Sequence, residues 1–249
     1  MKFVKVDILG GIATVSLGRG RVNALNNTLV DEMMQCLRAL ADDGDIKAVV
    51  LTGRDKFFSF GFDIPEFLSF DKAAFTSFLT RFSDLYTYLF TYPKPVVAAL
   101  NGHTIAGGCM LALACDYRIM ITGSAKLSLN EITFGASVFA GATEMLRFWV
   151  GSATATEVLY SGAMYSAEEA LDRDLIQAVA RGDQLIDRAR QIAEDLAAKP
   201  APAFASIKSL LRNPVAEEMV RREAASIHEF VEIWYTEDTW VNIQNINIH

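Results

Sequence analysis

The sequence contains few cysteines and few prolines. Among its 249 residues there are three cysteines, Cys36, Cys109 and Cys115, and six prolines. An odd number of cysteines without a Cys-x-x-Cys pair argues against a disulfide framework. We interpret Cys109 and Cys115, which lie in an apolar stretch, as core residues. The scarcity of proline leaves little room for a proline-rich linker between domains.

Histidine is equally scarce, and no residue pattern indicates a metal site. His103, His228 and His249 have no histidine or cysteine partner at a recognised ligand spacing, so we predict no bound metal. His249 ends the chain and is expected to be solvated. The chain also lacks the Gly-x-Ser-x-Gly elbow of hydrolases and a phosphate loop with Gly-Lys-Ser/Thr.

Basic residues are in the minority and long apolar runs are missing. There are 23 lysines and arginines against 30 acidic residues, which gives a formal net charge of -7. Nucleic-acid binding needs a basic face, so nucleic acid is not expected as the main partner. The longest apolar run, 105–115, is far shorter than the roughly 20 residues that span a bilayer. We therefore expect a soluble, cytoplasmic protein with no membrane partner.

Apolar residues make up 51% of the chain, enough for a sizeable core. Alternating residues predict a hairpin of strands 3–9 and 12–17. Nearly continuous apolar runs predict buried strands. The further strands expected are 46–52, 96–100, 117–121, 126–128 and 175–180.

Apolar positions three and four residues apart predict several helices. The first begins at residue 27 or 28 and ends near 42, and a short one covers 110–114. The helices expected after residue 142 are 153–160, 167–171, 183–198, 201–211 and 216–234. We therefore predict an α/β fold in one domain unit, with a core over 1–190 and a helical C-terminal region over 191–249. That region is expected to form an oligomer interface or to be buried in its own chain.

Two loops after apolar strands could bind a ligand. The first is 57–64, with the sequence FFSFGFDI, and the second is 101–110, with the sequence NGHTIAGGCM. In the second loop Gly107 and Gly108 precede a helix, whose first N–H groups are unpaired and suit an anion. Tight packing of the helix on a strand is the alternative explanation of these glycines. The start of the loop 18–23 resembles a dinucleotide fingerprint, but Asn23 ends it, which argues against a Rossmann dehydrogenase.

Glu131 is the candidate general base. It lies in the sequence Leu129-Asn130-Glu131, before the largely apolar stretch 132–141. A glutamate that faces an apolar pocket has a raised pKa and can accept a proton near neutral pH. A helix cap or an exposed acid is the alternative.

Five short motifs lie in the order and spacing of one known family. They are NALN (23–26), FSFGFD (58–63), PVVAALNG (95–102), AGGC (106–109) and CDYR (115–118). Together they resemble the crotonase superfamily, also called the enoyl-CoA hydratase/isomerase family, over nearly the whole chain. The resemblance implies a spiral of ββα units with a helical C-terminal region that builds homotrimers or dimers of trimers.

The resemblance also implies an acyl-CoA thioester as the substrate, with coenzyme A part of that substrate and no separate cofactor. The thioester oxygen would lie between the backbone N–H groups of Phe62 and Gly107, an oxyanion hole in which one donor typically lowers the barrier by roughly 3–4 kcal/mol. The other residues placed at the substrate are Val22, Ala24, Lys56, Phe60, Gly61, Asp63, Ile64 and Asn130.

The carboxylates of the family distinguish its reactions. Hydratases use two glutamates to activate one water, and the first directly follows the Gly-Gly-Cys stretch, where this chain has Met110. The second corresponds to Glu131. One base without a partner that holds water suits proton transfer from C2 to C4 of a 3-enoyl thioester. The segments 106–113, 115–119 and 129–131 are especially similar to mitochondrial-type Δ3,Δ2-enoyl-CoA isomerases, and Asn130 is expected to orient the base or the thioester.

Alternatives remain open at this point. Within the family they are a divergent hydratase, hydrolase or decarboxylase that uses another residue such as His103. If the protein is not an enzyme, the alternative is a non-catalytic acyl-CoA-binding protein. The basic residues considered for the CoA phosphates are Arg19, Arg21, Arg54, Lys56 and Lys208. The aromatic residues considered for the acyl pocket are Phe67, Phe75, Phe78, Phe82, Phe134, Phe139 and Trp149.

Overall fold

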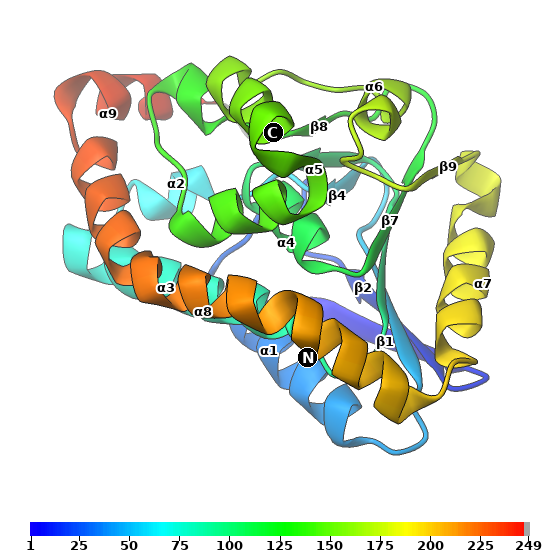
Figure 1. The fold of residues 1–249 in the computed structure, drawn as a ribbon. Coiled ribbons are helices and arrows are strands. Elements are labelled where there is room, and N and C mark those ends of the chain that lie inside the picture. Colours follow the sequence, from blue (N-terminus) through cyan, green and yellow to red (C-terminus); the bar gives the residue numbers. More distant parts are fainter. Residues whose placement is uncertain (247–249) are drawn as a thin grey trace.

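A six-stranded sheet forms the centre of the fold, seen in a computed structural model that describes residues 1–246 (Figure 1). Its strand order is β1-β2-β3-β5-β7-β9. The strands β1 and β2 form the predicted antiparallel hairpin, and every other neighbouring pair is parallel. The strands of this sheet are β1 (Val4–Leu9), β2 (Ile12–Leu17), β3 (Ala48–Thr52), β5 (Val96–Leu100), β7 (Tyr117–Ile121) and β9 (Ala178–Ala180).

A second sheet contains three short parallel strands in the order β4-β6-β8. They are β4 (Phe57–Ser59), β6 (His103–Ile105) and β8 (Leu127–Ser128). Each follows a strand of the large sheet, so the chain alternates between the two sheets and adds a helical segment after each pair. This arrangement confirms the predicted α/β spiral of ββα units.

Helices cover both faces of the large sheet. The longer ones are α1 (Asn27–Asp42), α3 (Lys72–Phe90), α5 (Ala140–Ser161), α7 (Leu185–Ala197) and α8 (Ala201–Trp234). The shorter ones are α2 (Ile64–Phe67), α4 (Gly107–Ala114), η1 (Glu131–Phe134), α6 (Ala167–Asp172), η2 (Gly182–Gln184) and α9 (Glu237–Gln244). Within residues 1–246, no helix is both long enough and apolar enough to span a bilayer.

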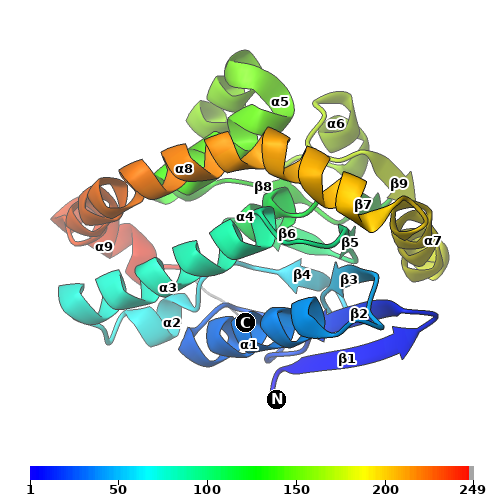
Figure 2. The ribbon, with the colours of Figure 1, turned by 60° about the horizontal axis from the view of Figure 1, so that its bottom comes forward.

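The two faces of the sheet bury different side chains, which explains why its central strands are apolar throughout. Val50 and Val97 pack in a small cluster with Leu185 and Ala189 of α7. Their neighbour Leu51 faces the main core. Figures 1 and 2 show α7 on the side of the sheet opposite α1, α3 and α4. The three cysteines are buried and form no disulfide, as the sequence predicted.

The structure corrects several predicted elements. No helix was predicted over 72–90, where α3 lies. The two helices predicted over 201–211 and 216–234 are one continuous helix, α8, with Pro214 inside it. The predicted helix 153–160 is the second part of α5, which begins at Ala140 and is interrupted at Gly151 by non-helical backbone (φ 71, ψ 172).

A buried ionic cluster attaches α8 to the core. Lys208 donates to the Asp116 carboxylate over 2.8 Å, and Arg212 lies 3.0 Å from the other oxygen of the same carboxylate. Arg212 also donates to the backbone oxygens of Phe90 and Ala114. Lys208 is only 5% exposed, so its proposed contact with a CoA phosphate is wrong: the long helix turns this side chain inward.

Asp116→Asn should reduce the free energy of unfolding by about 3–5 kcal/mol, because two buried cations lose their shared carboxylate. Urea unfolding measures the change. Asp183→Asn is the control, since the pair of Asp183 with Arg181 is largely exposed and should contribute less than about 1 kcal/mol. Equal small effects of the two substitutions would contradict the assigned role of the buried cluster.

Candidate active site

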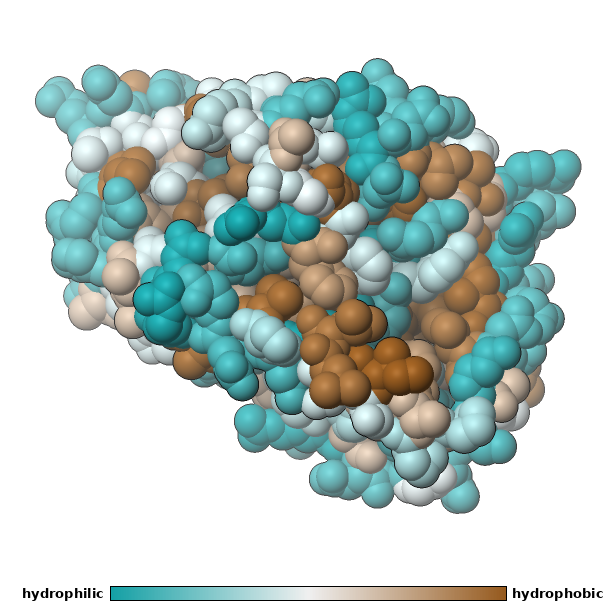
Figure 3. Space-filling view, in the orientation of Figure 1, coloured by the Kyte–Doolittle hydropathy of each residue, from teal (hydrophilic) through white to brown (hydrophobic). Residues whose placement is uncertain are grey.

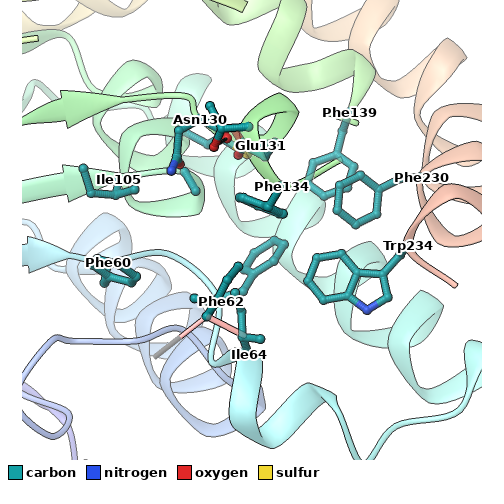
Figure 4. Close-up of a pocket in the computed structure, with 14 residues that line it drawn as sticks. Phe60, Phe62, Ile64, Ile105, Asn130, Glu131, Phe134, Phe139, Phe230 and Trp234 are labelled. Atoms are coloured by element: carbon teal, nitrogen blue, oxygen red, sulfur yellow. Dashed lines mark hydrogen bonds between the residues drawn. The ribbon is translucent and has the colours of Figure 1, made fainter. Parts of the chain in front are cut away.

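An apolar cavity of about 230 Å³ lies between the small sheet, η1 and the end of α8 (Figure 4). It brings together five predicted site residues: Phe60, Phe62, Ile64, Asn130 and Glu131. The other residues that line it are Ile105, Ala106, Met110, Thr133, Phe134, Phe139, Phe230, Trp234 and Ile246.

Glu131 is the buried carboxyl group of this cavity. It begins η1 directly after Asn130 and is 5% exposed. Its Oε2 atom has no hydrogen-bond partner within residues 1–246, and neither does Oδ1 of Asn130. Burial raises the pKa of Glu131 to about 8, because the charged form loses its hydration. A carboxyl group in this state can both accept and return a proton near neutral pH.

Two glycine loops contact each other where their residues Phe62 and Ala106 line the cavity, although Gly61 and Gly107 themselves are not among the lining residues. Gly61 has a φ of 93, and a Cβ atom built on it would lie 3.2 Å from the backbone nitrogen of Gly107. A Cβ atom on Gly107 would lie 3.0 Å from the Phe62 ring. The loops approach this closely because neither glycine carries a side chain.

The loops present two unpaired backbone donors. Among the described residues, no acceptor is found for the N–H of Phe62 or for that of Gly107. The Gly107 donor also lies in the first turn of α4, at the positive end of the helix dipole. Two such donors can stabilise an oxygen that becomes negatively charged.

Met110 lines the same cavity as Glu131. It projects from α4 into the cavity lining and is 1% exposed. Its thioether cannot transfer a proton. Of the described residues that line the cavity, Glu131 is the only one with a carboxyl group.

A second, shallower cavity gathers Val22, Ala24 and Asp63 beside Arg19 and Arg21. The segment 60–64 borders both cavities, since Phe60 and Ile64 line the first. The Asp63 carboxylate already forms an ion pair of 2.6 Å with Arg19 and caps α2.

Two predicted polar candidates lie away from the lining of both cavities. Lys56 is exposed. His103 lies on β6, where its Nδ1 accepts the backbone N–H of Lys126 and its ring packs on Phe57.

The aromatic candidates divide into two groups. Phe134 and Phe139 line the cavity as considered. Phe67, Phe75, Phe78 and Phe82 are fully buried in the main core, and Trp149 packs on Arg118 and donates to the Leu113 oxygen.

Two aromatic residues that line the cavity were not predicted. Phe230 and Trp234 come from the end of α8, roughly a hundred residues after Glu131, and Figure 4 shows Phe230 beside Phe139 and Trp234 next to Phe230. No local pattern identifies them, since they belong to the apolar side of a helix that only tertiary packing places over the cavity.

The spiral of ββα units, with its glycine loops beside a buried carboxyl group, defines the chain as a member of the crotonase superfamily. The sequence model described as enoyl-CoA hydratase/isomerase matches residues 7–243. The chain therefore belongs to the enoyl-CoA hydratase/isomerase family and is an enzyme of that family.

Individual relatives carry both names of the family. The probable enoyl-CoA hydratase of Bacillus subtilis is 31% identical over 235 residues, covering 94% of this chain and 91% of the relative. The mitochondrial enoyl-CoA delta isomerase 1 of Mus musculus is 29% identical over 229 residues, covering 91% and 79%. The crystal structure of human mitochondrial delta3-delta2-enoyl-CoA isomerase has a TM-score of 0.91 at 27% identity and covers 97% of this chain and 95% of its own.

Glu131→Gln should make the protein more stable, and increasingly so as the pH rises. With a folded-state pKa of about 8 instead of the ordinary 4.5, the folded chain holds more protons than the unfolded chain between these values. Wild-type stability therefore falls as pH rises through this window and levels off above it. The advantage of Glu131→Gln in urea unfolding should grow by several kcal/mol between about pH 5 and about pH 9.

The control is Glu229→Gln, which changes an exposed glutamate on α8. Its stability relative to wild type should not show this trend. A constant difference for Glu131→Gln across the same range would show that the carboxyl group titrates normally.

Proposed function

We propose that the protein is a Δ3,Δ2-enoyl-CoA isomerase that uses Glu131 as its single proton carrier. The observation that carries the proposal is that one cavity contains both Met110 and a buried Glu131 whose Oε2 atom has no hydrogen-bond partner among the described residues. A hydratase mechanism with two glutamates needs a second carboxyl group to hold the water, and the thioether of Met110 cannot replace it.

The reaction moves one proton and one double bond. The Glu131 carboxylate removes a proton from C2 of the 3-enoyl thioester, and the electrons shift to the thioester oxygen to form a dienolate. The Phe62 and Gly107 N–H groups stabilise this oxygen, each by roughly 3–4 kcal/mol in the transition state. The Glu131 carboxylic acid then returns the proton to C4, and the double bond becomes C2=C3.

The apolar cavity would hold the acyl chain and the shallower cavity the CoA part of the substrate. Arg21 borders the shallower cavity and supplies positive charge for the phosphates in an acidic protein, whereas Arg19 of the same lining is already paired with Asp63 and Glu66. Lys56, exposed directly before β4, would contact the outer part of CoA. In this proposal Asn130 supplies a polar group beside the base, and no separate cofactor takes part.

We also propose that the chain forms a homotrimer or a dimer of trimers. Ile207, Leu210 and Leu211 on α8 are between 58% and 76% exposed. Figure 3 shows an apolar patch over this part of α8. Contact with further copies of the chain would remove this surface from water.

Hydration of a 2-enoyl-CoA at the same site is the second candidate function. The names of several relatives at about 30% identity favour it. An activity panel with 3-enoyl-CoA and 2-enoyl-CoA of several chain lengths separates isomerase from hydratase. Absence of turnover with retained binding would instead identify a non-catalytic acyl-CoA-binding protein.

Glu131→Gln should lower kcat for 3-enoyl-CoA isomerisation by about 10³-fold or more, with little change in KM, because the amide cannot accept the C2 proton. In the wild type, kcat/KM should increase with pH and level off above about pH 8, since the base must be ionised in the free enzyme. Steady-state kinetics with Glu229→Gln as control checks both statements. Undiminished turnover by Glu131→Gln would rule out the mechanism.

Met110→Glu should introduce hydration of 2-enoyl-CoA, at least about tenfold above the wild-type rate, because it adds the second carboxyl group beside the cavity. Met110→Leu is the matched control, which should keep isomerase activity and gain no hydration. Formation of the 3-hydroxyacyl thioester is measured for each variant. If the wild type already hydrates 2-enoyl-CoA as fast as it isomerises 3-enoyl-CoA, the role assigned to Met110 is wrong.

A further inference from the structure

Ala106 has a backbone conformation that alanine rarely adopts. Its φ is 49 and its ψ is -120, at the residue that precedes the first turn of α4. The Cβ atom makes this region unfavourable for every residue except glycine, which adopts it readily. Glycine could occupy this position without strain, yet the chain has alanine. This suggests that the methyl group of Ala106 has a role.

Hydrogen bonds hold both sides of this residue. The Ala106 N–H donates to the backbone oxygen of Ser128 over 2.8 Å, and the Ala106 oxygen accepts the N–H of Met110 over 3.0 Å. The peptide group that follows contains the N–H of Gly107. The orientation of that donor is therefore fixed by the conformation of Ala106.

The methyl group of Ala106 also lies against the other loop. A Cβ atom built on Gly61 would lie only 3.0 Å from the Ala106 Cβ. Gly61 is bonded directly to Phe62, the source of the second unpaired N–H. Ala106 is thus bonded to one donor residue and packs against the neighbour of the other.

We propose that Ala106 is a positioning residue that sets the spacing of the Phe62 and Gly107 N–H groups. This inference rests on the proposed function, in which both groups bind the thioester oxygen. The strained backbone directs the Gly107 donor, and the methyl group keeps the Gly61 loop from moving closer. Glycine at this position would relieve the strain and leave the distance between the two loops unfixed.

The test compares Ala106→Gly with Asp174→Gly in the full chain. Asp174 also has a positive φ, of 58, but it is exposed and lies outside the cavity lining. Both substitutions relieve backbone strain, so both should raise Tm. Only Ala106→Gly should lower kcat for 3-enoyl-CoA, by about tenfold or more, with KM changed by less than about threefold.

Infrared spectroscopy of bound hexanoyl-CoA, labelled with ¹³C at the thioester carbonyl, reports on the two donors without turnover. In the wild type and in Asp174→Gly the carbonyl stretch should shift to lower frequency on binding. In Ala106→Gly the shift should be smaller. Such a change in carbonyl polarisation would not follow from a residue that only supports the fold.

Three results would overturn the inference. Wild-type kcat and carbonyl shift in Ala106→Gly would show that the methyl group does not position the donors. A lower Tm in Ala106→Gly would show that the backbone is not strained. No carbonyl shift in the wild type would refute the proposed thioester site itself, and the inference about Ala106 with it. This outcome differs from the first two, which would refute only the role of Ala106.

Discussion

The site depends on the burial of the Glu131 carboxyl group, whose Oε2 atom has no hydrogen-bond partner within residues 1–246. In water Glu131 would be a weak base at neutral pH, whereas its apolar surroundings raise its pKa to about 8. This burial is unfavourable for the charged form, so the rest of the fold has to supply the stability that keeps it. Phe139, Phe230 and Trp234 line the cavity that contains this group, and the ionic cluster at Asp116 holds the helix that carries two of these rings.

The second constraint is the close approach of two loops from successive turns of the spiral. A Cβ atom on Gly108 would lie 2.5 Å from the Ser59 oxygen, so α4 can begin directly against β4 only with glycine there. This packing places the Gly107 donor next to the segment that carries Phe62. The proposed base and donors therefore come from three different loops, and the parallel order β4-β6-β8 aligns these loops at one edge of the small sheet.

Much of this arrangement was predictable from sequence, because its signals are local. The glycines at 61, 107 and 108 and the acid at 131 lie directly after short apolar strands. The helix over 72–90 was missed although its apolar residues have helical spacing, since phenylalanine and threonine also favour strands. The helices predicted over 201–211 and 216–234 are one helix because tertiary packing maintains α8 through Pro214. The positions of the Phe230 and Lys208 side chains depend on how α8 packs against the rest of the fold. No short sequence motif encodes this packing.

In the proposed reaction Glu131 carries a proton from C2 to C4, and no second carboxyl group among the described lining residues can hold a catalytic water. The most direct measurement follows a 3-enoyl-CoA labelled with deuterium at C2, with mass spectrometry and NMR of the product. The account predicts a 2-enoyl thioester in which part of the label is found at C4. A product without any label at C4, or a 3-hydroxyacyl thioester as the main product, would contradict it.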